Sequence, residues 1–141
     1  MRFGAKEVPR EEYLKLLKDI QDQTGIAIIF ITHDFGIVER ICDRVAVMYA
    51  GKIVELAPTQ ELFQEQLHPY TKALLYAIPI QDPRVNARHI HLKGEVPSLI
   101  TPPSGCRFHP RCSKCDGVSC SETEPVLKEV KKNHFVACYQ Y

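Results

Sequence analysis

Residues 26–55 read IAIIFITHDFGIVERICDRVAVMYAGKIVE, and this stretch predicts the fold class. Its first six residues, 26–31, are a continuous apolar run rich in β-branched side chains, typical of a strand buried on both faces of a parallel sheet. Asp34 stands where it could cap a short helix. Residues 45–49 predict a second strand, which the Ala50–Gly51 turn joins to a returning strand over 52–56. With an amphipathic helix predicted over 10–23, the order of elements indicates an α/β protein with part of a parallel sheet.

The chain changes character after Pro58. Thr59 is predicted to cap a helical stretch that runs to about Leu67, and His68 begins another helix with proline in its first turn. From Pro79 to residue 105 the chain is rich in proline and lacks periodicity, which predicts an extended connector with one short strand around residues 89–92. We therefore expect three parts. Residues 1–57 end an α/β domain, 58–79 form a helical connector, and 80–141 form a small irregular module.

The overall composition narrows the class of protein. Hydrophobic residues make up 45% of the 141 residues, charged residues 25%, and the formal net charge is +1. A charge this small gives no electrostatic support for binding nucleic acid, which we do not expect as a partner. No apolar run approaches the roughly 20 residues that span a bilayer. The N-terminus also lacks the apolar core of a signal peptide, so a cytoplasmic protein is expected.

Five of the six cysteines lie in the last 36 residues, at positions 106, 112, 115, 120 and 138. In a reducing compartment, clustered thiols are more often metal ligands or redox sites than structural disulfides. Cys112 and Cys115 form a CxxC pair, which suits tetrahedral zinc as well as an iron–sulfur cluster. Spacing alone favours zinc, and disulfides rank last. A metal would also supply folding energy to a tail that buries little apolar surface, so we expect a metal-stapled module.

His33 follows directly after the predicted strand over 26–31. Ligands of open parallel sheets bind beyond the carboxyl ends of the strands, so an imidazole there could contact a phosphate and orient a water molecule. From position alone, a structural role is the better-supported alternative, because a single histidine is a weak signal.

Several motifs together resemble the ATP-binding subunits of ABC importers for oligopeptides, dipeptides and nickel. They are IFITHD at 29–34, DRVAVM at 43–48, GKIVE at 51–55, HPYT at 68–71 and GCRFHPRC at 105–112. The resemblance covers nearly all of the chain from about residue 14. It implies that His33 is the switch histidine that senses the terminal phosphate of ATP. It also implies two kinds of partner, a second ATP-binding subunit and membrane permease subunits, and a peripheral location on the inner face of the cell membrane.

The same resemblance implies that the C-terminal cysteines hold a 4Fe-4S cluster, with Cys106, Cys112, Cys120 and Cys138 as ligands. Two features depart from the family pattern. One more residue than usual separates Cys112 from Cys120, and Cys115 is an additional thiol. Cys115 could therefore replace Cys120 as a ligand, and zinc is the alternative metal. In either case the metal is expected to hold the tail together rather than to carry electrons, because no partner redox motif is visible.

The motifs that bind and hydrolyse ATP are not found in these 141 residues. The sequence has no GxxxxGK[ST] loop, no LSGGQ-like segment and no hydrophobic strand ending in Asp-Glu. We therefore expect no ATP hydrolysis by this chain alone, and interpret it as part of a longer subunit or as a short protein derived from one. The second interpretation predicts a non-catalytic metal-binding accessory module. An unpaired strand edge at 26–31 further predicts self-association.

Overall fold

The computed structural model describes residues 9–77 and 92–141. The chain divides into two compact units, Met1–Cys42 and Asp43–Tyr141. The second unit combines helices with a sheet, as predicted for an α/β protein, but the sheet is antiparallel and not parallel. Residues 134–136 pair there with the strand over 52–58, so segments from the first and third predicted parts share one sheet. The division into 1–57, 58–79 and 80–141 stays a prediction.

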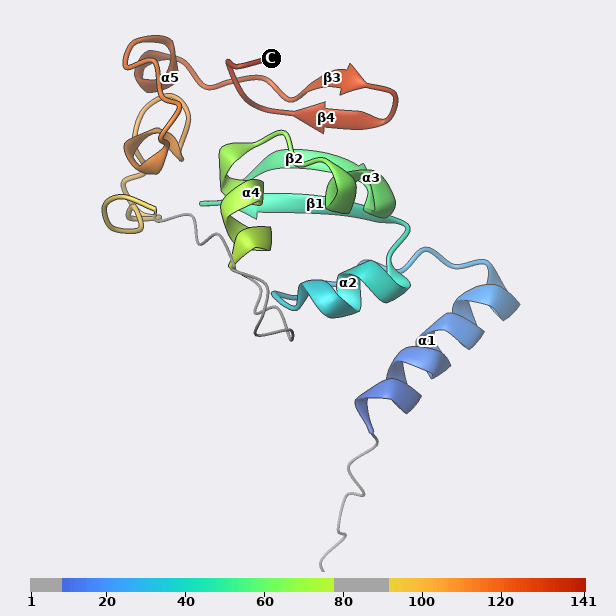
Figure 1. Cartoon of the computed structure of the whole chain (residues 1–141). Coiled ribbons are helices and arrows are strands. Elements are labelled where there is room, and N and C mark those ends of the chain that lie inside the picture. The colour runs from blue at the N-terminus through green and yellow to red at the C-terminus, as the bar shows by residue number, and fades with distance from the viewer. Residues whose placement is uncertain (1–8, 78–91) are drawn as a thin grey trace, which may run out of the picture. The chain divides into compact units, whose positions relative to one another are not determined.

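The described residues of the first unit, 9–42, contain two helices, and both match predicted ones (Figure 1). Helix α1 spans Arg10–Thr24 and helix α2 spans Phe35–Ile41. α1 ends at Gly25, whose φ of 68° lies in the left-handed region that glycine adopts without strain. Asp34 caps α2 as predicted, because its Oδ1 accepts a hydrogen bond from the N–H of Ile37 at 3.2 Å. This hydrogen bond is the largest cause of the lowered pKa of the Asp34 carboxyl.

The predicted strand over residues 26–31 is wrong. These residues form no strand, and the side chains of Ile29 and Ile31 are 90% and 93% exposed. The backbone groups of a strand need a neighbouring strand as their hydrogen-bonding partner. Within 9–77 and 92–141, no segment pairs with this one. The self-association predicted from a strand edge at these residues stays a prediction.

The second unit is built on a four-stranded sheet (Figure 1). In chain order its strands are β1 Arg44–Tyr49, β2 Lys52–Pro58, β3 Lys128–Lys131 and β4 His134–Val136. Their order across the sheet is β1-β2-β4-β3, and each neighbouring pair is antiparallel. The predicted hairpin of β1 and β2 is confirmed, whereas the expected parallel pairing is absent from the described residues. The sequence did not indicate β3 and β4, which bring the C-terminal tail beside β2.

The turn between β1 and β2 explains why this hairpin was predictable. Ala50 and Gly51 both have positive φ, 47° and 82°. A two-residue turn of this kind matches the twist of the strands it joins, and glycine adopts it with the least strain. Tyr49 then pairs with Lys52 directly across the turn. Residues of β1 alternate between buried and exposed, as expected for a sheet with one covered face.

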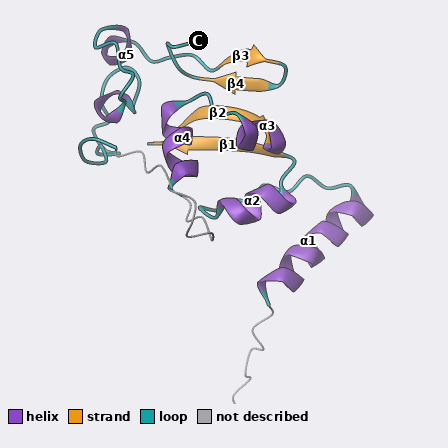
Figure 2. Ribbon diagram, viewed as in Figure 1, coloured by secondary structure: helices purple, strands orange, loops and turns teal. Residues whose placement is uncertain are grey.

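Among its described residues, the second unit has three short α-helices and a single 3-10 turn over His109–Arg111 (Figure 2). The α-helices are α3 Thr59–Gln64, α4 Pro69–Tyr76 and α5 Ser119–Glu122. α3 packs against β1 and β2. Thr59 is the first residue of α3 rather than its cap, which is Pro58, and the helix ends before the predicted Leu67. α4 begins with Pro69 as predicted, and His68 caps it.

The predicted connector from Pro79 to residue 105 is described only in part. Residues 92–105 contain no helix or strand, in agreement with an extended connector. The short strand predicted around residues 89–92 lies almost wholly outside the described residues.

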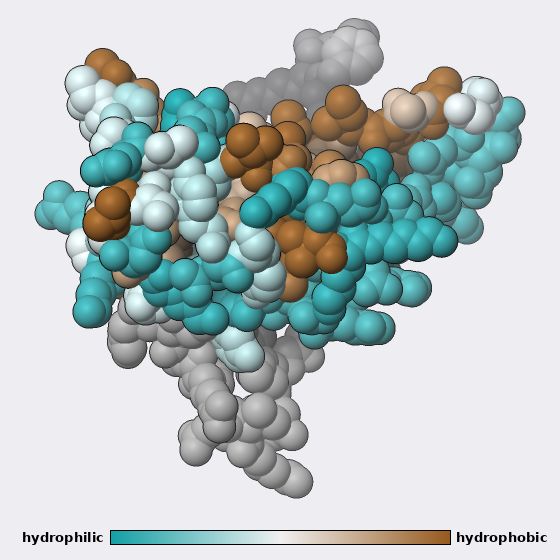
Figure 3. Space-filling model, turned by 90° about the horizontal axis from the view of Figure 1, so that it is seen from above, coloured by the Kyte–Doolittle hydropathy of each residue, from teal (hydrophilic) through white to brown (hydrophobic). Residues whose placement is uncertain are grey.

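The interior of the second unit centres on large side chains that are almost fully buried, among them Leu62, Phe108 and Val136. Hydrophobic residues also reach the surface, where Figure 3 shows brown patches among teal, hydrophilic ones. In the part of the chain that the structure describes, no helix has both the length and the apolar character needed to cross a bilayer.

Candidate metal centre

Phe108 joins two motifs that lie far apart in the sequence. Its side chain is 1% exposed, and its ring packs edge-on against Tyr49 of β1 with 5.1 Å between the ring centroids. The rings of Tyr70 and His68, from the HPYT segment, lie 5.4 and 5.7 Å from it. Aromatic pairs with this geometry are stabilising beyond the area they bury. The GCRFHPRC segment is therefore held against the hairpin and the start of α4.

Arg107 anchors the same segment to the β1–β2 turn. Its guanidinium donates a hydrogen bond to the carbonyl oxygen of Ala50. A Cβ atom at Gly51 would lie 3.3 Å from the donating nitrogen, which leaves little room for a larger residue in the turn. The first cysteine, Cys106, is thus positioned from the hairpin by the two residues that follow it.

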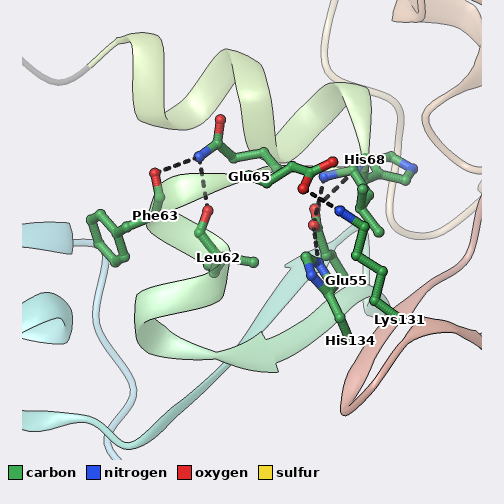
Figure 4. A network of polar contacts seen from close by, with 9 residues as sticks. Glu55, Leu62, Phe63, Glu65, His68, Lys131 and His134 are labelled. Atoms are coloured by element: carbon green, nitrogen blue, oxygen red, sulfur yellow. Dashed lines mark hydrogen bonds and ion pairs between the residues drawn. The ribbon is translucent and has the colours of Figure 1, made fainter.

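A buried carboxylate connects the hairpin to the C-terminal strand (Figure 4). Glu55 on β2 is 0% exposed, and one of its oxygens accepts hydrogen bonds from Nε2 of His134 and from the N–H of Leu67, each at 2.7 Å. The other oxygen accepts from the N–H of His68 at 3.0 Å. A buried charge is tolerated only with such partners around it. Glu55 therefore ties β2, the start of α4 and β4 together.

Two further contacts support this arrangement. Burial lowers the pKa of His68 from 6.5 to about 4, so the ring is neutral at neutral pH. Its Nδ1 can then accept the hydrogen bond from the N–H of Tyr70, at 3.1 Å. Nearer the surface, Lys131 of β3 forms an ion pair with Glu65, as Figure 4 shows.

Strand β4 places Cys138. The N–H of Ala137 donates to the carbonyl oxygen of Val54 at 2.9 Å, and Cys138 packs with Leu67 and Val136. Burial raises the pKa of the Cys106 thiol, and the thiols of Cys138 and Cys112 raise it further. In the described part of the chain, however, Cys106, Cys112 and Cys138 do not form a group of potential ligands within 4.8 Å of one another.

Backbone amides point at two of the sulfur atoms. The N–H of Lys114 donates to Sγ of Cys112 at 3.4 Å, and the N–H of Gly117 donates to Sγ of Cys115 at 3.3 Å. Burial is the largest cause of the raised pKa of Cys112, with Cys138 and Cys115 adding to it. Amide donors of this kind stabilise thiolates that bind metals.

Cys120 is held by its backbone and by Asp116. Its carbonyl oxygen accepts from the N–H of Cys106 at 2.8 Å, and its own N–H donates to Oδ1 of Asp116 at 3.1 Å. Burial, together with the Asp116 carboxylate, raises the pKa of the Cys120 thiol to about 12. The two Sγ atoms of Cys115 and Cys120 and a carboxylate oxygen of Asp116 all lie within 4.8 Å of one another.

Asp116 was missed by the sequence analysis. The feature of the sequence that could have indicated it is its position directly after the CxxC pair. From there its carboxylate accepts a hydrogen bond from the N–H of Cys120, near the start of α5. This contact brings Cys120 beside Cys115, which the spacing of the cysteines alone does not predict.

Within the described residues, the structure gathers only part of the predicted ligand set into one tight group. Three of the predicted ligands, Cys106, Cys112 and Cys138, influence one another, and Cys120 lies beside the additional thiol of Cys115. Thiols with raised pKa values hold their protons at neutral pH, and a soft cation binds by displacing those protons. Several sulfur donors with amide N–H groups directed at them suit zinc and iron–sulfur clusters alike.

The histidines have different surroundings. His33 is exposed and immediately precedes Asp34, the cap of α2, and its role as a phosphate sensor stays a prediction. Nδ1 of His109 lies 2.9 Å from the carbonyl oxygen of Cys106, so this ring supports the backbone beside a predicted ligand. His89 and His91 lie outside the described residues.

Comparison with known proteins gives one family match and several close relatives. Residues 54–120 match the family model for the C-terminal region of oligopeptide/dipeptide transporters. A probable peptide ABC transporter ATP-binding protein of Sinorhizobium fredii is 49% identical over 128 residues, which are 91% of this chain and 36% of that protein. A putative oligopeptide transport ATP-binding protein of Bacillus subtilis is 45% identical over 132 residues, 92% of this chain and 40% of that protein.

A third relative, a dipeptide transport ATP-binding protein of Haemophilus influenzae, is 43% identical over 130 residues. These residues are 92% of this chain and 39% of that relative, so the chain spans about two fifths of the length of the curated relatives it matches. The matched residues include Glu55, the HPYT segment and the first four C-terminal cysteines. Residues 54–120 of this chain therefore match the C-terminal region of oligopeptide/dipeptide transporters, and most of the chain is similar in sequence to the ATP-binding proteins of peptide ABC transporters.

Proposed function

We propose that this chain is the C-terminal part of the ATP-binding subunit of a peptide or nickel ABC importer, with a cysteine module that holds a 4Fe-4S cluster. The observation that carries the proposal is the packing of Phe108 against Tyr49, His68 and Tyr70, which makes the separate family motifs one folded unit. The subunit would work with a second ATP-binding subunit and with membrane permease subunits. Its place would be the cytoplasmic face of the membrane.

The proposed cluster ligands are Cys106, Cys112, Cys120 and Cys138. A bound cluster would supply folding energy by cross-linking loops that bury little apolar surface. The protein's own contribution is to position the thiols: Arg107 fixes the first loop on the hairpin turn, and β4 fixes Cys138 on β2.

The second candidate is a non-catalytic accessory module that binds zinc. It is favoured by the CxxC pair, in which amide N–H groups donate to the sulfurs of both Cys112 and Cys115. Such a pair suits tetrahedral zinc.

Metal analysis separates the two candidates. Chain purified without oxygen is expected to be brown, to absorb in the visible range, and to contain iron and sulfide in equal amounts. A colourless chain with one zinc ion and no sulfide would refute the cluster and leave the zinc module.

A matched pair of variants identifies the third ligand. If Cys120 binds the metal, Cys120→Ser is expected to lower the metal content several-fold, while Cys115→Ser retains it. The reverse result would assign the position to Cys115. Cys42→Ser, in the first unit, is the control for loss of any thiol.

The catalytic part of the proposal concerns ATP. We propose that His33 acts as the phosphate sensor only alongside a phosphate-binding loop, and that these 141 residues alone do not hydrolyse ATP. Release of inorganic phosphate from ATP and Mg²⁺ is expected to equal that of a buffer blank, and to be the same for His33→Ala. Phosphate release that the substitution abolishes would contradict the proposal.

A further inference from the structure

Cys115 is the one C-terminal cysteine to which the proposed ligand set gives no role. It is partly exposed, whereas Cys120 is only 7% exposed. The Sγ atoms of the two residues lie within 4.8 Å of each other. Among the residues that the structure describes, these two thiols and the Asp116 carboxylate form the only group of three potential metal ligands whose atoms all lie within 4.8 Å of one another.

The local backbone explains why the two thiols meet. Gly117 has a φ of 86°, which turns the chain back between them, and its N–H donates to Sγ of Cys115. Asp116 accepts from the N–H of Cys120 and so holds the start of α5 against this turn. The turn therefore places the two thiols side by side.

We propose that Cys115 and Cys120 form a redox-sensitive pair, in which peroxide oxidises the exposed Cys115 and the buried Cys120 then closes a disulfide with it. An accessible thiol beside a second, resolving thiol is the arrangement used by redox-sensing cysteines. The inference goes beyond the proposed function, because it concerns the chain when no metal occupies Cys120.

The chemistry is balanced with hydrogen peroxide as the oxidant. The sulfur of Cys115 attacks a peroxide oxygen, the O–O bond breaks, and the products are a sulfenic acid and water. The sulfur of Cys120 then attacks the sulfur of the sulfenic acid, which forms the S–S bond and releases a second water. Two thiols are oxidised by two electrons in total, and one peroxide molecule is reduced.

The geometry favours Cys120 over the other thiols as the resolving partner. A disulfide needs the sulfurs about 2.05 Å apart, so Cys115 and Cys120 have to approach by less than about 3 Å from their separation in this structure. Cys112 is the competitor, because it completes the CxxC pair. Its sulfur accepts from the N–H of Lys114, and it does not belong to the group that Cys115, Asp116 and Cys120 form within 4.8 Å.

Trypsin makes the two outcomes directly distinguishable. Cleavage after Arg111 and Lys114 leaves Cys112 in the peptide 112–114, and cleavage after Lys128 leaves Cys115 and Cys120 together in the peptide 115–128. A Cys115–Cys120 disulfide is therefore a loop within one peptide, two hydrogens lighter and resistant to alkylation. A Cys112–Cys115 disulfide joins two peptides.

The experiment treats the full chain, reduced and freed of metal, with hydrogen peroxide, then alkylates and digests it for mass spectrometry. The internal disulfide of peptide 115–128 is expected to exceed every other cross-link by at least about fivefold. In Cys115→Ser, Cys120 should be alkylated after the same treatment, and Cys42→Ser should behave as the unaltered chain. A dominant Cys112–Cys115 cross-link, or a Cys115 that stays reduced, would overturn the inference.

A second arm keeps this test separate from the metal proposal. Chain loaded with zinc or with iron and sulfide, its metal content measured, receives the same peroxide. If Cys120 is a ligand, the disulfide yield falls with metal occupancy. An undiminished yield would count against Cys120 as a ligand, and leave the redox pair in place.

Discussion

Glu55→Ala is expected to lower the free energy of unfolding by about 3–5 kcal/mol, because it removes a buried acceptor that serves several buried hydrogen-bond donors. The substitution leaves His134 and the amides of Leu67 and His68 buried without their acceptor. Unfolding in urea, followed by circular dichroism, measures the change. Because the alanine variant can fail to fold, Glu55→Gln provides a milder case. It keeps the side-chain volume and one acceptor oxygen, so its urea midpoint should lie between those of Glu55→Ala and the unaltered chain.

Glu65→Ala is the matched control for this prediction. Glu65 is also paired with a basic residue, Lys131, but both side chains are about half exposed. Exposed ion pairs contribute little to stability, so this variant should unfold close to the unaltered chain. Equal urea midpoints for the Glu55 and Glu65 variants would show that the buried carboxylate is not a structural centre of the fold.

Gly105→Ala is expected to have the second large effect, on the cysteine module itself. A Cβ atom at this position would lie 2.4 Å from the carbonyl oxygen of Cys120 and 2.7 Å from the carbonyl carbon of Ser121. Both contacts are with backbone, so the loop has to open and the hydrogen bond from Cys106 to Cys120 is lost. Because that bond aligns two proposed ligands, metal affinity should fall by about 10- to 100-fold, as when supporting contacts of a metal site are removed. A chelator competition titration measures it.

Gly117→Ala separates the clash from backbone strain. Gly105 and Gly117 both have positive φ, 65° and 86°, but no atom lies within 4 Å of a Cβ built at Gly117. This variant therefore carries only the strain of a left-handed residue, roughly 1–2 kcal/mol. A similar loss of metal affinity in both variants would mean that the backbone conformation, and not the close approach to Cys120, is what the module needs.

Features governed by neighbouring residues were predictable from the sequence. The cap at Asp34 depends on an amide three residues away, and the hairpin depends on two turn residues with positive φ. Pro69 at the start of α4 is equally local. These elements were found because one short segment contains all the atoms that decide them.

The wrong prediction of a strand over residues 26–31 shows that the local sequence alone does not decide where strands form. Its β-branched run is suited to burial between neighbouring strands, yet the described residues offer it none. β3 and β4 are the opposite case. They are four and three residues long, with no strong alternation, and they become strands because β2 offers a pairing edge to β4. Strand formation needs a partner, and the identity of the partner is not a local property.

The sequence by itself determined the composition of the cysteine module, the hairpin and the motifs that carry the family match. Only the tertiary structure decided how those motifs meet. Phe108 packs between the HPYT segment and β1, Glu55 of β2 bonds to His134 of β4, and Cys115 lies beside Cys120. The physical reason is the separation along the chain. Glu55 and His134 are 79 residues apart, and their contact exists only when packing of the whole unit offsets the entropy of bringing them together.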